Sequence, residues 1–121
     1  MRKGLFMGTL LLACPLYAHA AQREWKGTTE GTTSATIKYD TIAGTGSVQA
    51  MGQMCFASLE GKAVPTANGF AIVAHDGNTN CKLGITLNAQ GDITSSDEGP
   101  GCITYHGASC SFDVMSAHAT H

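Results

Sequence analysis

The stretch of sequence that decides the fold runs Cys81-Lys82-Leu83-Gly84-Ile85-Thr86-Leu87-Asn88. Its apolar residues alternate with polar ones, so that Leu83, Ile85 and Leu87 would share one face of an extended chain. A period of two residues is typical of a β-strand with one face buried in the core and the other exposed to solvent. The stretch therefore predicts a half-buried strand with partners on both sides.

Similar runs lie on both sides of this stretch. Those that we interpret as strands are residues 34–40, 48–59, 69–74 and 110–114, with a further strand at Ile93. Gly52 argues against a helix in 48–59, because glycine destabilises a helix interior. Turn residues such as Asp76-Gly77-Asn78 and Gly99-Pro100-Gly101 separate the runs. The pattern predicts an all-β domain, a small antiparallel β-barrel or sandwich.

The first twenty residues have the order of a secretory signal peptide. Met1-Arg2-Lys3 is positively charged, an apolar run follows, and Ala18-His19-Ala20 is a small-residue cleavage pattern. The apolar run of about a dozen residues is shorter than the roughly 20 that a transmembrane helix needs. We therefore expect residues 1–20 to be removed and residues 21–121 to form a single β-domain. Residues 117–121 are expected to be a disordered tail.

A second interpretation of the N-terminus is a lipoprotein signal. Leu11-Leu12-Ala13-Cys14 resembles a lipoprotein box, in which Cys14 would be lipidated and become the new N-terminus. Leu12 at the middle position and Pro15 directly after the cysteine both fit that pattern poorly. We therefore expect a periplasmic or secreted protein, with lipid anchoring through Cys14 as the alternative.

The charge of the chain argues against nucleic acid as a partner. The chain has seven basic and nine acidic residues. Loss of Arg2 and Lys3 with the signal leaves five basic residues against nine acidic ones, a net charge of −4. A nucleic-acid-binding domain usually presents clustered Lys and Arg, and no such cluster is present in the sequence. The mild negative charge suits a cationic partner, and it suits ordinary solubility as well.

Four cysteines remain after the signal peptide, namely Cys55, Cys81, Cys102 and Cys110. An even number in a short exported chain predicts two disulfides. Three pairings are possible, and one of them joins Cys102 to Cys110 across a hairpin around His106-Gly107. Zinc sites usually contain two cysteines two to four residues apart, and these spacings are much wider.

We predict that the protein is not an enzyme, because no catalytic constellation is evident. His75 and Asp76 are neighbours on a strand, so their side chains would point to opposite faces. The segment from Tyr105 to Ser109 contains a histidine and a serine. It lacks the Gly-x-Ser-x-Gly pattern of a nucleophile elbow.

Metal binding is the alternative that the sequence leaves open, although we expect no cofactor. The candidate ligands are His75, His106, His118 and His121, together with Met51 and Met54. Imidazole and thioether groups are ligands for copper and zinc. Methionines are more often core filling, which is the role we expect for Met51 and Met54.

The C-terminal part of the chain combines cysteines and strand spacing in the pattern Cys81-x-Leu83-x-Ile85, Ile93-x-Ser95 and Gly101-Cys102-x-x-Tyr105-His106-Gly107-Ala108-x-Cys110-Ser111-Phe112. Over roughly residues 53–115, this pattern resembles small bacterial periplasmic proteins described as lysozyme-inhibitor-like β-domains. The resemblance implies a small antiparallel barrel or sandwich. It also favours a disulfide between Cys81 and Cys102, which leaves Cys55 to pair with Cys110.

The functional expectation is an exported, disulfide-stabilised binding protein. The resemblance implies an exported partner such as a peptidoglycan hydrolase, with inhibition of a lysozyme as the activity. An immunity protein against an exported toxin is a further alternative. The characterised inhibitors of C-type lysozymes carry a Gly-Ala-Arg-Tyr-like segment and a downstream lysine, and neither is present here. No inhibitory residue is therefore carried over, because similarity of fold alone does not imply function. The oligomeric state is not predicted.

Overall fold

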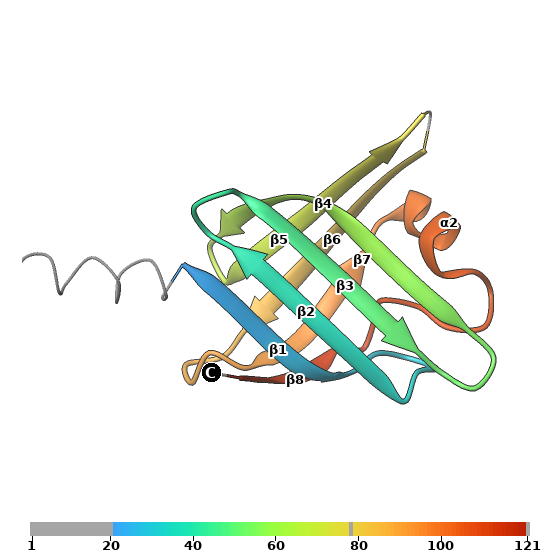
Figure 1. Cartoon of the computed structure of the whole chain (residues 1–121), viewed down its shortest axis with the longest axis horizontal. Helices are drawn as coiled ribbons and strands as arrows, with labels where there is room; N and C mark the ends of the chain where they lie inside the picture. Colours follow the sequence, from blue (N-terminus) through green and yellow to red (C-terminus); the bar gives the residue numbers. More distant parts are fainter. Residues whose placement is uncertain (1–20, 78, 121) are drawn as a thin grey trace, which may run out of the picture.

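The computed structural model describes residues 21–77 and 79–120 as an eight-stranded antiparallel barrel (Figure 1). Each strand pairs with the next one in the chain, and the last strand pairs with the first to close the barrel. The strands are β1 (Gln22–Thr28), β2 (Ser34–Asp40), β3 (Thr45–Met51), β4 (Phe56–Thr66), β5 (Gly69–Asp76), β6 (Thr79–Leu87), β7 (Ile93–Glu98) and β8 (Ser116–Ala119). The predicted all-β fold is confirmed, and it is a barrel.

Side chains fill the interior of the barrel. Strand β6 buries Cys81, Leu83 and Ile85 and exposes Lys82, as its alternation predicted. The bulkiest buried side chains of the described residues include Trp25, Phe70, Phe112, Ile37, Leu59 and Ile72. An interior of eight strands is just wide enough for such side chains to fill. The inside of the barrel is therefore a packed core.

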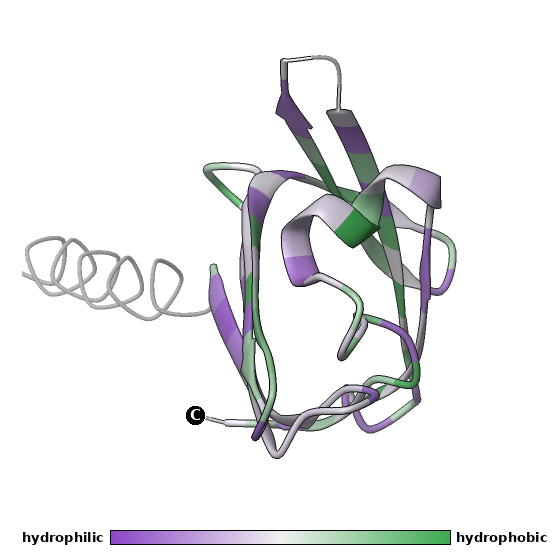
Figure 2. Cartoon of the chain, turned by 90° about the vertical axis from the view of Figure 1, so that its right-hand side faces the viewer, coloured by the Kyte–Doolittle hydropathy of each residue, from purple (hydrophilic) through white to green (hydrophobic). Residues whose placement is uncertain are grey.

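A short helical segment and a loop cover one end of the barrel (Figure 2). A 3-10 helix, η1 (Pro100–Cys102), leads into the single turn α2 (Ile103–His106). The loop of residues 107–115 follows and leads into β8. We call residues 99–115 the cap. No helix among residues 21–77 and 79–120 is long and apolar enough to cross a membrane.

The prediction of a strand at 110–114 is wrong, because this segment belongs to the cap. Cys110 and Phe112 are buried, which produces the alternation, but Val114 is exposed and has a φ of 56°. Strands β7 and β8 share only the pair Ile93 and Ala117. Side chains of β7 therefore bond to the cap where a backbone ladder would otherwise continue.

Two other expectations also fail for reasons of pairing. Residues 48–59 are not one strand, because a turn at 52–55 separates β3 from β4 and Gly52 N–H bonds the Cys55 carbonyl. Residues 117–119 are not a disordered tail, because β8 pairs with β1 and buries Ala117. The signal peptide with Cys14, and also Asn78 and His121, lie outside the described residues.

Candidate binding face

Both disulfides lie at the capped end of the barrel. They join Cys55 to Cys110 and Cys81 to Cys102, which is the pairing that the resemblance favoured. Cys102 and Cys110 stand on either side of α2, Cys55 directly precedes β4, and Cys81 belongs to β6. The two bonds therefore fix the cap to two different hairpins of the barrel.

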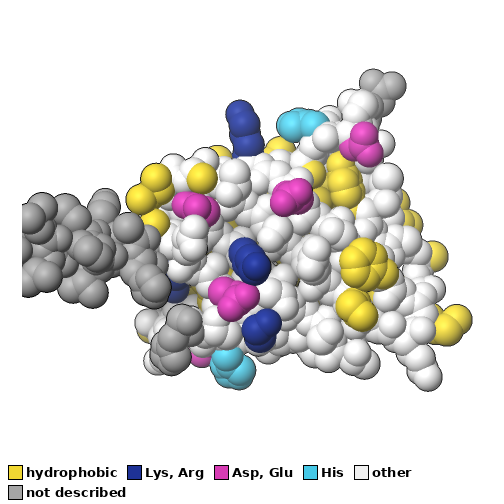
Figure 3. Space-filling model, viewed as in Figure 1, with side chains coloured by type: hydrophobic (Ala, Val, Ile, Leu, Met, Phe, Trp, Pro, Cys, Tyr) yellow, Lys and Arg dark blue, Asp and Glu magenta, His cyan; other side chains and the backbone are white. Residues whose placement is uncertain are grey.

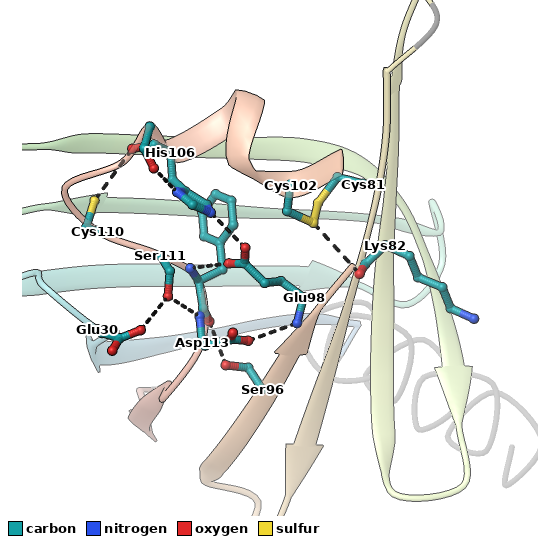
Figure 4. Close-up of polar contacts among 12 residues, drawn as sticks. Glu30, Cys81, Lys82, Ser96, Glu98, Cys102, His106, Cys110, Ser111 and Asp113 are labelled. Atoms are coloured by element: carbon teal, nitrogen blue, oxygen red, sulfur yellow. Dashed lines mark hydrogen bonds and ion pairs between the residues drawn. A yellow bond between two sulfur atoms is a disulfide. The ribbon is translucent and has the colours of Figure 1, made fainter. Parts of the chain in front are cut away.

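A largely buried hydrogen bond between His106 and Glu98 joins the cap to β7 (Figure 4). His106 is 7% exposed, and its Nε2 lies 2.8 Å from Oε2 of Glu98 in β7. The other oxygen of Glu98 accepts a hydrogen bond from Phe112 N–H at 2.7 Å. The second ring nitrogen of His106, Nδ1, lies 2.5 Å from the Gly107 carbonyl. The two ring nitrogens of His106 are thus engaged by Glu98 of β7 and by the Gly107 carbonyl of the cap, which is a structural role.

Strand β7 also bonds the loop that follows α2. The Ser96 hydroxyl donates to the Phe112 carbonyl at 2.6 Å and accepts from Met115 N–H at 3.1 Å. Glu98 N–H donates to Oδ1 of Asp113 at 2.9 Å. These bonds satisfy backbone groups on both sides of Val114, as buried peptide groups require.

Val114 itself occupies an unfavourable conformation. Its φ of 56° lies in the left-handed region, and it is the one non-glycine residue with positive φ among those that the structure describes. A β-branched residue in this region is a genuine outlier. Such strain costs on the order of 1–3 kcal/mol and is typical of functional sites. The Val114 side chain is nevertheless exposed, so burial in the core does not compensate for the strain.

The capped end also gathers exposed apolar side chains. We call five of them the apolar rim: Met51, Met54, Phe56, Ile103 and Val114. Met51 and Phe56 face each other across the β3–β4 hairpin, and Met54 lies in its turn and is 80% exposed. Figure 3 shows large hydrophobic side chains toward the end of the β1–β4 face where this turn lies. Clustered exposed apolar groups usually mark an interaction site.

The expectation that Met51 and Met54 fill the core is wrong. The inward positions of the hairpin belong to Ala50 and Ala57, which are buried. The β3–β4 register therefore leaves Met51 on the outer face. The sequence patterns do not reveal the rim, although one signal is present. Met54 follows Gly52 closely, and an apolar residue in a turn is rarely buried.

A second feature of this end is a projecting hairpin (Figures 1 and 2). Strand β4 pairs with β5 only as far as Val73, and β7 pairs with β6 only as far as Leu83. Beyond these points, β5 and β6 pair only with each other. We call this part, residues 74–77 and 79–81, the finger.

The histidines named as metal candidates are not brought together. His75 is in the finger, where its ring contacts the Asn80 side chain, and His106 is in the cap. His118 is in β8, with Nδ1 at 3.3 Å from a carboxylate oxygen of Asp92. Among residues 21–77 and 79–120, no three His, Cys, Asp or Glu side chains are placed to hold a metal ion.

The outer face of β1–β4 carries two open hollows of about 560 and 490 Å³. They share Glu24, Lys38, Ser47 and Glu60, which are polar side chains on regular strands. None of these four belongs to the capped end. The hollows are a solvated, mixed-charge surface, whereas the apolar and strained residues lie at the cap.

The capped end therefore combines a fixed cap, an exposed apolar rim and a projecting finger. Such a surface can present a preformed shape to another molecule. The chain matches no family model, no curated protein and no solved structure with which it was compared. Only the geometry of the chain itself therefore bears on what the domain does.

Proposed function

We propose that the mature domain is an exported binding protein that docks on another exported protein through its capped end. The observation that carries the proposal is the apolar rim. Its five side chains are exposed on the end of the barrel that both disulfides hold in place. Aromatic residues and methionines are enriched at protein interfaces, and they supply much of the binding energy in the centre of a contact.

Rigidity supports the same proposal. The disulfides, the Glu98–His106 pair and the bonds from Ser96 order the cap before any partner arrives. A surface that is already ordered loses less conformational entropy on binding, so more of the contact energy appears as affinity. Two disulfides are also typical of an oxidising compartment, which is why we place the domain in the periplasm or outside the cell.

The partner that we propose is a basic peptidoglycan hydrolase such as a lysozyme. Residues 21–121 carry five basic and nine acidic side chains, which leaves a net charge of −4. Opposite net charges steer two proteins together and raise the rate of association. The expected activity is binding, with inhibition as its consequence where the bound domain covers the active site.

The test is calorimetric titration of oxidised residues 21–121 against C-type and G-type lysozymes and lytic transglycosylases. We expect binding to at least one of them. The double variant Met54→Ser, Phe56→Ser should weaken that binding by about tenfold or more, since truncating central apolar contacts costs over ~1.4 kcal/mol.

The matched control is Ile42→Ser, which removes an equally exposed apolar side chain from the turn between β2 and β3. Its affinity should stay within about threefold of wild type, which is the usual range for a residue outside the contact. Failure of the wild-type domain to bind any member of the panel would remove the claim of a hydrolase partner. Equal losses in the control and in the double variant would contradict the rim as the contact.

A further inference from the structure

Methionines supply the reactive sulfur atoms of the domain. The chain has five methionines, and Met1 and Met7 precede residue 21, so three remain in residues 21–121. The four cysteines of this part are joined in two disulfides and carry no free thiol. A methionine thioether is oxidised by peroxides to a sulfoxide. The exposure of the three methionines therefore decides where an oxidant acts on the domain.

These three methionines differ widely in exposure. Met54 is 80% exposed and Met51 is 54% exposed, whereas Met115 is 1% exposed and belongs to the core. An oxidant has to reach the sulfur atom, so susceptibility follows exposure. In the folded domain, Met51 and Met54 are open to an oxidant, and Met115 is protected.

The turn that carries the exposed pair is fixed in place. The Met51 carbonyl accepts hydrogen bonds from the N–H and the hydroxyl of Thr33, at 2.8 and 3.2 Å. Gly52 packs on the loop between β1 and β2, where an added Cβ would lie 2.4 Å from the Gly31 carbonyl oxygen. The disulfide at Cys55 closes the other side of the turn. The backbone therefore keeps both methionine side chains on the outer surface.

We propose that Met51 and Met54 form an oxidation site, at which hydrogen peroxide turns the apolar rim polar and weakens its contact with a partner. The effect on binding rests on the proposed function and deepens it, because it makes the docking surface sensitive to oxidants. Both sulfurs lie in one hairpin of the rim, and Phe56 is paired with Met51 across that hairpin. Two oxidations there change the polarity of one continuous part of the rim.

The reaction is a two-electron oxidation of each sulfur. A sulfur lone pair attacks one oxygen of hydrogen peroxide, so that an S–O bond forms as the O–O bond breaks. The second oxygen leaves as hydroxide, which takes the proton from the transferred oxygen and becomes water. The sulfur is oxidised and the peroxide is reduced. The sulfoxide is polar, and an apolar contact that buries it without a hydrogen-bond partner is weakened.

The first measurement locates the oxidation. Residues 21–121, with both disulfides formed, are treated with graded hydrogen peroxide, and peptide masses show which methionines gain one oxygen. Met51 and Met54 should react at least about tenfold faster than Met115 in the folded domain, and at similar rates in urea. Equal rates for all three methionines in the folded domain would overturn the proposed site.

The second measurement follows the polarity of the rim without any partner. After peroxide is removed, the wild-type domain should elute earlier from a hydrophobic-interaction column than before treatment. The double variant Met51→Leu, Met54→Leu should show no such shift, because leucine has no sulfur to oxidise. The matched control Met115→Leu replaces a buried methionine by a side chain of similar volume. It should shift as wild type does, and a shift of equal size in the double variant would contradict the assignment.

The third measurement is affinity, with a C-type lysozyme as the first probe from the panel. Only the domain is exposed to peroxide. Each protein is compared with itself before and after treatment, so any change that the leucines make to the starting affinity cancels. Wild type and Met115→Leu should bind about tenfold or more weakly after treatment, and the double leucine variant should change by less than about threefold.

The outcomes separate this inference from the proposed function. If the wild-type domain binds and its affinity survives oxidation of both methionines, the inference is wrong and the binding function stands. If peroxide weakens the double leucine variant as much as wild type, another residue is responsible and the inference is again wrong. If no panel member binds, the proposed hydrolase partner falls, and the masses and column shifts still support or overturn the oxidation site.

Discussion

Val114 is the residue at which local preference and structure conflict most clearly. Its left-handed backbone is maintained because Phe112, Asp113 and Met115 are bonded to side chains or backbone of β7. An asparagine would adopt this conformation at lower cost, because its short polar side chain tolerates positive φ. That a valine stands here, exposed, is consistent with a contribution to the apolar rim.

We predict that Val114→Asn stabilises the domain and weakens its binding. The free energy of unfolding should rise by about 0.5–1 kcal/mol, because strain is relieved and little burial is lost. Urea denaturation measures the change. Val114→Ala is the control, since alanine also disfavours positive φ and should give no comparable gain. A lower unfolding midpoint for the asparagine variant would contradict the assignment of strain.

Glu98 is the residue on which the cap most depends. Glu98→Ala would leave the Phe112 N–H and the His106 ring without their carboxylate partner. Buried polar groups that lose a partner of this kind cost about 2–3 kcal/mol, and chemical denaturation should show a loss of that size. Asp97→Ala, at an exposed neighbouring position, should change stability by less than about 0.5 kcal/mol. Similar effects of the two substitutions would refute the role of Glu98.

At the scale of elements, sequence patterns identified strands more reliably than connections. The alternation in residues 81–88 correctly predicted β6, because Leu83 and Ile85 need a core on one side only. The same alternation at 110–114 led to a wrong prediction of a strand. Cys110 is buried by its disulfide and Phe112 by packing of its ring, and together they produce the spacing of a strand in a loop. Alternation shows which side chains are buried. It does not show whether the backbone forms hydrogen bonds with a neighbouring strand or with side chains.

The apolar rim and the closed barrel could not be predicted for a related reason. Whether Met51 points inward depends on its register with β4, and a shift of one residue reverses every side chain. Closure depends on the pairing of Trp25 with Ala119, which are far apart in the sequence. The cysteines were informative because their pairing carries long-range information that short patterns lack.

The two disulfides should make separable contributions. Replacing Cys55 and Cys110 by alanine opens a loop with a sequence separation of 55, and replacing Cys81 and Cys102 opens one of 21. The chain-entropy model gives losses of about 4 and 3 kcal/mol respectively. Hydrogen exchange should show faster opening of the β3–β4 turn in the first variant and of the finger in the second. Identical exchange patterns in the two variants would contradict separate roles.

Strand β8 should be sensitive to acid at its contact with Asp92. Ala119 N–H donates to Asp92, and this bond, followed by the contact with His118, lowers the pKa of Asp92 below its usual 3.8. A lowered pKa in the folded state adds stability above the unfolded pKa, and this contribution is lost as pH falls through the folded value. The protection factor of the Ala119 amide against hydrogen exchange should therefore fall below about pH 4 in wild type. The Asp92→Asn variant should show no such step, and a step that persists there would rule out Asp92 as its cause.

At the scale of the whole molecule, the barrel has two different ends. One end carries both disulfides, the cap, the finger and the apolar rim. The other consists of short turns, below which Tyr39 and Trp25 stack on Phe70 inside the barrel. The proposed binding function would use this asymmetry, with the barrel as a stable support for one contact face.

Binding to a basic partner should depend on ionic strength in a particular way. The association rate should fall steeply as salt rises from about 0.01 to 0.5 M, because the screening length shrinks from about 30 Å to a few ångströms. The dissociation rate should change little, since apolar contacts in the rim are not screened. Surface plasmon resonance separates the two rates. A rise of the dissociation rate alone would show that charge acts within the contact and not in steering.

The pairing of β8 with β1 also protects an edge of the sheet. Until Ser116–Ala119 is in place, β1 has an unpaired edge, and an open edge invites pairing with other chains. A variant truncated after Met115 is therefore expected to aggregate through the exposed edge of β1 and not to persist as a less stable monomer.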